Sequence, residues 1–192
     1  MKIPFLKFKT LASIGLLALT IASCSNDDED KMLSLYEKLG GFAKVQDPND
    51  NTKMIEKGRL AFRSVVDSTV TLIVTDIVAG NQGNLAPHFA PLLAEVGSGN
   101  TTNLALLSKS LTDFFAANTG GGTTNTYSGL NMVDAHNPAV NPRMGKKSTN
   151  ADYTRFVGFV GQAAGKNGVT DTAIINEVVK VLESLRAPIV QE

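Results

Sequence analysis

The stretch Tyr127-Ser128-Gly129-Leu130-Asn131-Met132-Val133-Asp134-Ala135-His136 anchors the interpretation of the chain, because it places one imidazole after a glycine-rich break. His136 is one of only two histidines among 192 residues. Neutral imidazole is the commonest protein ligand of metals, and one histidine can hold haem iron because the porphyrin supplies four nitrogens. A lone histidine is more often a hydrogen-bonded structural residue, so the spacing alone leaves both interpretations open.

Two separated motifs resemble those of truncated haemoglobins, the short bacterial and protist globins, and in particular their group 1. The stretch ending at His136 is similar to the segment that carries the proximal histidine of that family. Far upstream, Leu35-Tyr36-Glu37-Lys38-Leu39-Gly40-Gly41 is similar to the family's opening motif, and the two motifs come in the family's order. The resemblance implies that His136 binds the iron of a haem b. Attachment would be non-covalent, since no Cys-x-x-Cys-His occurs.

The same resemblance implies further haem contacts. Phe89 falls where the family has a haem-packing phenylalanine before the distal helix, and Met132 matches a haem-contacting methionine. On the distal side, the position of the family's glutamine is Leu111, its neighbour facing the iron is Leu107, and the ligand-stabilising tyrosine becomes Val70. With Phe115 these residues predict an apolar haem wall. Bound oxygen is held by a hydrogen-bond donor, so the wall argues against tight oxygen storage.

Three insertions relative to the family are expected, near residues 46–54, 77–84 and 137–147. The last follows His136 directly and carries Met144, a potential second axial ligand, and Arg143, Lys146 and Lys147, which could pair with haem propionates. We expect instead a solvated basic loop in which Met144 packs. His88 is a further potential distal ligand, for which an exposed loop position is the expectation.

The first 23 residues predict a lipoprotein signal peptide, with a basic start and an apolar run at 11–21 that is too short to span a bilayer. Ile21-Ala22-Ser23-Cys24 resembles a lipobox, so Cys24 is the predicted lipidation site. Residues 24–30 form an acidic run that predicts a solvated tether, and 31–192 one domain. These features predict a protein anchored by lipid outside the cytoplasm, at a bacterial outer membrane or cell surface.

Apolar periodicity predicts an all-α domain. Helices are expected over about 31–39, 52–78 and 104–118, with two more beginning at Thr149 and at Thr170-Asp171; the latter should end near Pro188. Pro87 and Pro91 limit residues 85–96 to short helical turns. The resemblance, and not the periodicity, implies that four helices form a two-over-two sandwich.

Three functions are compatible with these observations: a haem globin that binds a diatomic gas or transfers electrons to a redox partner, a haem-free interaction module, and a haem-capture lipoprotein. The formal charge is zero and no Lys/Arg cluster alternates with aromatics, so nucleic acid is not an expected partner. An enzyme with acid–base or nucleophilic residues is not favoured, because no serine, cysteine or carboxylate pair is grouped with a histidine in the sequence.

Overall fold

The structure, a computed structural model, describes residues 32–192. The expected signal peptide, Cys24 and the acidic tether lie outside the described residues. Within 32–192, no helix combines the length and the apolar character needed to cross a membrane. Most of the described residues are helical, which confirms the predicted class, and the exception is one small two-stranded sheet.

The opening motif forms α1 (Leu35–Lys38), a single helical turn closed at both ends. At its start, the Ser34 side chain and the Glu37 side chain each bond the other residue's backbone N–H, which is a capping box. At its end, Gly40 has φ 107°, a conformation that favours glycine. The turn is held in place by Tyr36, whose ring is fully buried.

A β-hairpin follows where part of a helix was predicted. β1 (Lys44–Asp47) pairs antiparallel with β2 (Asp50–Glu56), with Val45 opposite Ile55. The prediction that the long helix begins at Thr52 is therefore wrong. The turn explains the difference, because the Asp47 side chain accepts the backbone N–H of Asn49 at 2.8 Å and reverses the chain before a helix can start.

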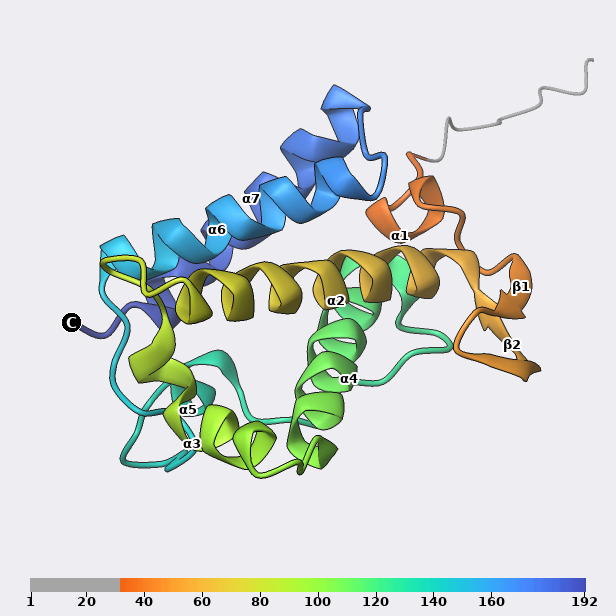
Figure 1. Cartoon of the computed structure of the whole chain (residues 1–192). Helices are drawn as coiled ribbons and strands as arrows, with labels where there is room; N and C mark the ends of the chain where they lie inside the picture. Colours follow the sequence, from red (N-terminus) through yellow and green to blue (C-terminus); the bar gives the residue numbers. More distant parts are fainter. Residues whose placement is uncertain (1–31) are drawn as a thin grey trace, which may run out of the picture. The chain divides into compact units, whose positions relative to one another are not determined.

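The long helix α2 (Lys57–Val78) is the element against which the others pack. It contacts α4 (Thr102–Ala116) on one side and α6 (Asn150–Lys166) on another, and α6 in turn contacts α7 (Thr172–Ile189) (Figure 1). α6 begins at a capping box between Thr149 and Asp152, as the sequence predicted. Asp171 caps α7, which runs through Pro188 and ends one residue later than expected.

Residues 86–97 form one continuous helix, α3 (Ala86–Gly97), so the prediction of short turns only is wrong. Pro87 lies in the first turn, where a helix does not need the missing N–H. Pro91 cannot bond the Pro87 carbonyl, and that carbonyl instead faces Gly145, where an added Cβ would lie 1.8 Å from its oxygen. The backbone hydrogen bond that Pro91 interrupts is therefore found where α3 contacts residues 141–148.

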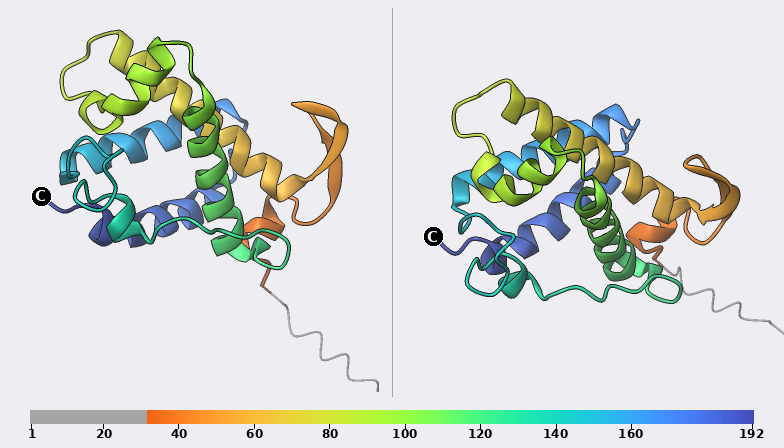
Figure 2. Two further views of the ribbon diagram at one scale, coloured as in Figure 1. Left: turned by 90° about the horizontal axis from the view of Figure 1, so that it is seen from below. Right: turned by 60° about the horizontal axis from the view of Figure 1, so that its bottom comes forward.

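After α4 the chain passes through η1 (Ala117–Gly121), where Gly120 has φ 113° and ends the helix as predicted. An extended segment leads to the short helix α5 (Met132–Ala135), which contacts α7. α3 and α5 overlap in Figure 1 but lie apart when seen from below (Figure 2, left). They reach the interior from different directions.

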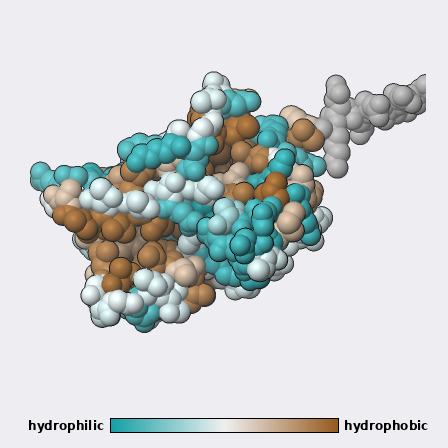
Figure 3. Space-filling view, turned by 45° about the vertical axis from the view of Figure 1, so that its right-hand side comes forward, coloured by the Kyte–Doolittle hydropathy of each residue, from teal (hydrophilic) through white to brown (hydrophobic). Residues whose placement is uncertain are grey.

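The buried core has two clusters. One joins α1, α2 and α4 around Leu35, Tyr36, Phe62 and Ala116, and the other joins α2 and α6 around Ile73, Leu85 and Phe159. Apolar side chains also reach the surface, where they cover a broad area of the face in Figure 3 below a band of hydrophilic groups. Space between the clusters is not fully filled by side chains, and the candidate site lies there.

Candidate functional site

An apolar cavity of about 330 Å³ lies among α3, α4, α6, α7 and the segment from Tyr127 to Ser148. This volume falls within the range of about 300–1,000 Å³ that is usual for small-molecule and cofactor sites. The lining is mainly aliphatic and aromatic, with a few polar groups that converge from α3, from the 127–148 segment and from the start of α6. Five segments distant in sequence therefore meet around one apolar space.

The structure brings together six of the seven residues that the resemblance assigned to the haem site. The six that line the cavity are Phe89 of α3, Leu107, Leu111 and Phe115 of α4, Met132 of α5, and His136 directly after α5. Met144, the potential second axial ligand, also lines it. Helical periodicity alone had identified Leu107, Leu111 and Phe115 only as a core stripe, so their common cavity is new information from the fold.

Val70 is the seventh residue, and the structure does not bring it to the main cavity. It lines a polar hollow bounded by the hairpin, α2 and α4. The fully inward positions of α2 are taken instead by Phe62, Val66, Thr69 and Ile73, which are buried. Val70 lies to one side of that stripe and is only partly buried.

His136 is positioned by α5. The Asn131 side chain caps this helix by accepting the Asp134 backbone N–H at 3.0 Å, and His136 follows its last turn half-buried. The Nδ1 atom of His136 lies 2.9 Å from the Met132 carbonyl oxygen. Since a carbonyl only accepts, Nδ1 carries the proton and Nε2 of the neutral ring keeps its lone pair. Burial lowers the pKa of His136 against the opposing effect of this hydrogen bond, and so favours the neutral form that metals bind.

His88 differs most from its expected state. It was predicted to be an exposed loop histidine, but it lies on α3 with a side chain only 5% exposed and lines the same cavity as His136. Within residues 32–192, neither ring nitrogen of His88 has a hydrogen-bond partner. A buried polar group without a partner costs about 1–3 kcal/mol, so such groups in native proteins require an explanation.

A carboxylate stands beside His88. Oδ2 of Asp152 lies 3.2 Å from His88 Nε2 and 3.6 Å from Lys146 Nζ. The same oxygen accepts the backbone N–H of Thr149 at 3.0 Å and its hydroxyl at 2.8 Å, as part of the α6 capping box. The capping bonds thus occupy this oxygen and fix its place at the edge of the cavity.

The other basic residues of the insertion are arranged differently. Arg143 forms a two-pronged ion pair with Glu95, with distances of 2.9 and 2.8 Å, which joins the insertion to α3. Arg143 and Lys147 are both exposed, as expected of a solvated basic loop, and Arg143 is in addition paired with Glu95.

Further polar residues line the cavity, namely Ser110, Ser148, Tyr127, Asn141 and Tyr153, and sequence reasoning missed the last three as lining residues. The Tyr127 hydroxyl donates to the Leu130 carbonyl at 2.7 Å, the Tyr153 hydroxyl to the Leu182 carbonyl at 2.6 Å, and the Asn141 amide to the Ala135 carbonyl at 2.8 Å. Each group hydrogen-bonds to the protein backbone. Tyr127 lies within the opening stretch, but its spacing gave no sign that its ring turns toward the cavity.

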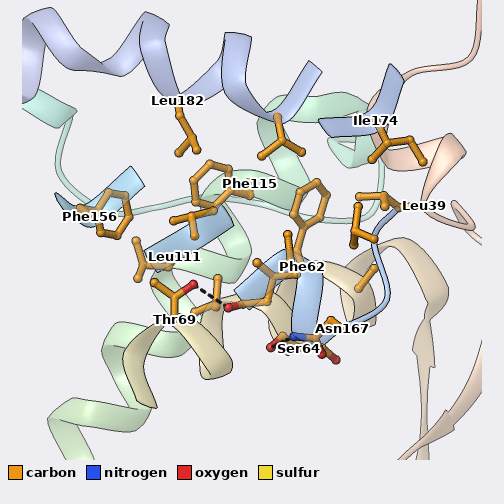
Figure 4. A pocket seen from close by; sticks show the side chains of 17 residues that line it. Leu39, Phe62, Ser64, Thr69, Leu111, Phe115, Phe156, Asn167, Ile174 and Leu182 are labelled. Carbon is orange, nitrogen blue, oxygen red and sulfur yellow. Dashed lines mark hydrogen bonds between the residues drawn. The ribbon is translucent and has the colours of Figure 1, made fainter. Parts of the chain in front are cut away.

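A second apolar cavity, of about 200 Å³, adjoins the first between α2, α6 and α7 (Figure 4). Leu111, Phe115 and Phe156 line both spaces and form the partition between them. The polar groups at its edge are paired: the Thr69 hydroxyl donates to the Val65 carbonyl, and Asn167 donates to the Ser64 carbonyl (Figure 4).

Chemically, the main cavity offers apolar and aromatic walls with two imidazoles. Such a lining suits a flat apolar cofactor whose metal takes nitrogen ligands. Among residues 32–192, no three His, Cys, Asp or Glu side chains are grouped so as to hold a bare metal ion. No protein-family model matches the chain, and no curated protein is significantly similar to it.

Proposed function

We propose that the domain is a haem-binding globin of the truncated type, which holds haem b in the main cavity with Nε2 of His136 as the axial ligand. The observation that carries the proposal is the meeting of His136, Met132, Phe89 and the α4 stripe around one apolar space. The sequence resemblance assigns these same residues to a haem site. Their convergence from three separate segments supports the assignment.

The helix arrangement also supports the proposal. α2 packs on α4, α6 packs on α7, and α2 contacts α6, so that two helix pairs lie against each other. This is the relationship that a two-over-two sandwich requires. The turn of the hairpin and Arg143 fall in two of the three expected insertions, outside the four main helices.

The residues of the chain fit the chemistry of haem. When bound, haem supplies an iron that exchanges electrons or takes up a diatomic ligand. The chain holds the His136 ring by its bond to the Met132 carbonyl, which sets the tautomer, as second-shell partners of metal-bound histidines do. Leu107, Leu111 and Phe115 make the α4 side of the cavity apolar. An apolar wall stabilises a polarised bound oxygen poorly, so electron transfer or binding of less polar gases is favoured.

We further propose, from the lipobox-like N-terminal sequence, that this domain is anchored by lipid at Cys24 outside the cytoplasm. Metabolic labelling with a radioactive or clickable fatty acid tests it in the intact organism. The label should appear on the wild-type chain and disappear from a Cys24→Ala variant.

Haem binding is tested by purifying the full chain and adding ferric haem. The expected result is a Soret band that stays with the protein through gel filtration, at one haem per chain. A protein that is helical by circular dichroism but never acquires a Soret band would contradict the proposal and favour a haem-free interaction module.

A further inference from the structure

We infer that His88 is a second axial ligand, so that haem in this protein is held between two histidines, His88 from α3 and His136 after α5. The inference rests on the proposed function and adds to it the coordination state. It is carried by one observation above all: His88 is 5% exposed, lines the cavity, and within the described chain has no hydrogen-bond partner at either ring nitrogen.

The position of His88 is fixed by its backbone. Its N–H donates to the Leu85 carbonyl at 3.0 Å within the first turn of α3, and its carbonyl accepts the Gly145 N–H at 3.4 Å. Gly145 in turn lies against the Pro87 carbonyl so closely that no larger residue fits there. Contacts with two segments therefore hold the imidazole inside the apolar space.

An imidazole nitrogen in an apolar space is satisfied by a hydrogen bond or by a metal. Leu107, Leu111 and Phe89, which line the same cavity, have no side-chain hydrogen-bonding groups. Oδ2 of Asp152 lies 3.2 Å from Nε2 as an ion-pair partner, so Nδ1 is the ring nitrogen with neither a hydrogen bond nor an ion pair among residues 32–192. An iron held in the cavity would satisfy this nitrogen without displacing any bond that the described residues make.

The two histidines reach the cavity from different segments. α3 and α5 lie apart when viewed from below (Figure 2, left), although both contribute to one cavity lining. Ligands from separate segments can lie on the two faces of one porphyrin, which two neighbours on a single helical turn cannot. Asp152, 3.2 Å from Nε2 of His88, is a carboxylate of the kind that orients metal-bound histidines.

Met144 is the competing ligand, because its thioether lines the same cavity. Three features favour His88: it is more deeply buried, its Nδ1 has neither a hydrogen bond nor an ion pair within residues 32–192, and it is held by α3. Met144 needs no hydrogen bond, so its position in an apolar lining is already explained by packing. Iron with two histidine ligands has no open position, which suits electron transfer and makes gas binding depend on departure of His88.

The test compares absorption and electron paramagnetic resonance spectra of the full chain with ferric haem added, in wild type, His88→Ala, His88→Leu and Met144→Leu. Wild type and Met144→Leu should be low-spin and six-coordinate. Both His88 variants should keep their haem and become high-spin, and free imidazole should restore the low-spin spectrum in His88→Ala. Carbon monoxide should bind the reduced His88→Ala protein at least about tenfold more tightly, because no internal ligand competes.

Each alternative outcome has a definite meaning. A high-spin wild type, or His88 variants with the wild-type spectrum, would overturn the inference while leaving haem binding by His136 in place. Loss of the low-spin state in Met144→Leu alone would assign the second ligand to Met144 and likewise overturn it. A wild-type protein that retains no haem would overturn the proposed function together with this inference. His88→Leu fills the space of the ring, so circular dichroism of this variant separates loss of a ligand from loss of folding.

Discussion

The Nδ1 atom of His136 lies 2.9 Å from the carbonyl oxygen of Met132, one helical turn earlier in the chain. This bond explains why the motif needs a short helix directly before its histidine. α5 presents the Met132 carbonyl to the ring, and the ring is left with Nε2 as its free lone pair.

Leu111 and Val70 give a matched test of which family positions face the haem. Leu111→Gln places an amide donor on the cavity wall, whereas Val70→Gln places the same side chain in the polar hollow on the other side of α2. In a His88→Ala background, Leu111→Gln should slow oxygen dissociation by about tenfold or more, since a hydrogen bond to a charged group is worth about 1.5–3 kcal/mol. Flash photolysis or rapid mixing measures the rate. An equal effect from Val70→Gln would contradict the placement of Val70 outside the site.

Gly120 should be intolerant of a side chain. It has φ 113°, and an added Cβ would lie 2.2 Å from the Ser34 hydroxyl oxygen. Gly120→Ala is therefore expected to lower the free energy of unfolding by about 1–3 kcal/mol, measured by urea denaturation. Gly161→Ala is the control, because this glycine is within α6 and an added Cβ meets nothing within 4 Å. It should raise stability by about 0.5–1 kcal/mol, and equal losses in both variants would refute the explanation.

Tyr153 joins α6 to α7 through its hydroxyl, which donates to the Leu182 carbonyl at 2.6 Å while the ring is 3% exposed. Tyr153→Phe should lower the free energy of unfolding by about 0.5–1.5 kcal/mol. Tyr127→Phe removes a similar bond, to the Leu130 carbonyl, at a more exposed position and should change stability by less than about 0.5 kcal/mol. Chemical denaturation of both variants decides whether burial sets the difference.

The hairpin should loosen in acid. Hydrogen bonds from Arg63 lower the pKa of Asp47 to about 2 from the usual 3.8, and the same bonds join β1 to α2 at 2.7 and 2.9 Å. Because the unfolded chain binds the proton first as pH falls, this pair stabilises the fold above about pH 4 and loses its effect as pH approaches about 2. Asp47→Asn should be less stable than wild type at neutral pH, and the two should converge in acid. Parallel pH profiles of the unfolding midpoint would contradict this role of Asp47.

The sequence predicted the helices whose ends carry local signals. Thr149 and Asp152 form the expected capping box, and Gly120 ends α4 as its backbone freedom suggested. The hairpin was missed because the apolar spacing of residues 52–56 also fits a helix. The hydrogen bond between the Asp47 side chain and the Asn49 N–H reverses the chain and favours a hairpin instead. The continuous helix α3 was missed because Pro91 cannot donate a hydrogen bond to the Pro87 carbonyl. In the structure this carbonyl contacts Gly145, which is distant in sequence.

The residues of the candidate site also divide into those that local sequence signals predicted and those that depend on the whole fold. His136 and the α4 stripe were predictable because both a motif and a helical period marked them. His88 was assigned to an exposed loop, and only the packing of α3 against the 141–148 segment shows that it is buried. Val70 lies in a different hollow from the other six residues, because the rotation of α2 about its axis depends on contacts with α4 and α6. Burial and helix rotation are properties of the whole fold, so local sequence carries little information about them.

The most direct test of the account is a titration of ferric haem into the full chain and into its His136→Ala variant, followed at the Soret band. We predict one tightly bound haem per wild-type chain and a loss of affinity of at least about 100-fold in the variant, as expected when a metal site loses a ligand. Circular dichroism should show equal helix content in both proteins. Equal haem affinity in wild type and His136→Ala, or no Soret band in a folded wild-type protein, would contradict the assignment of His136 as the ligand of haem iron.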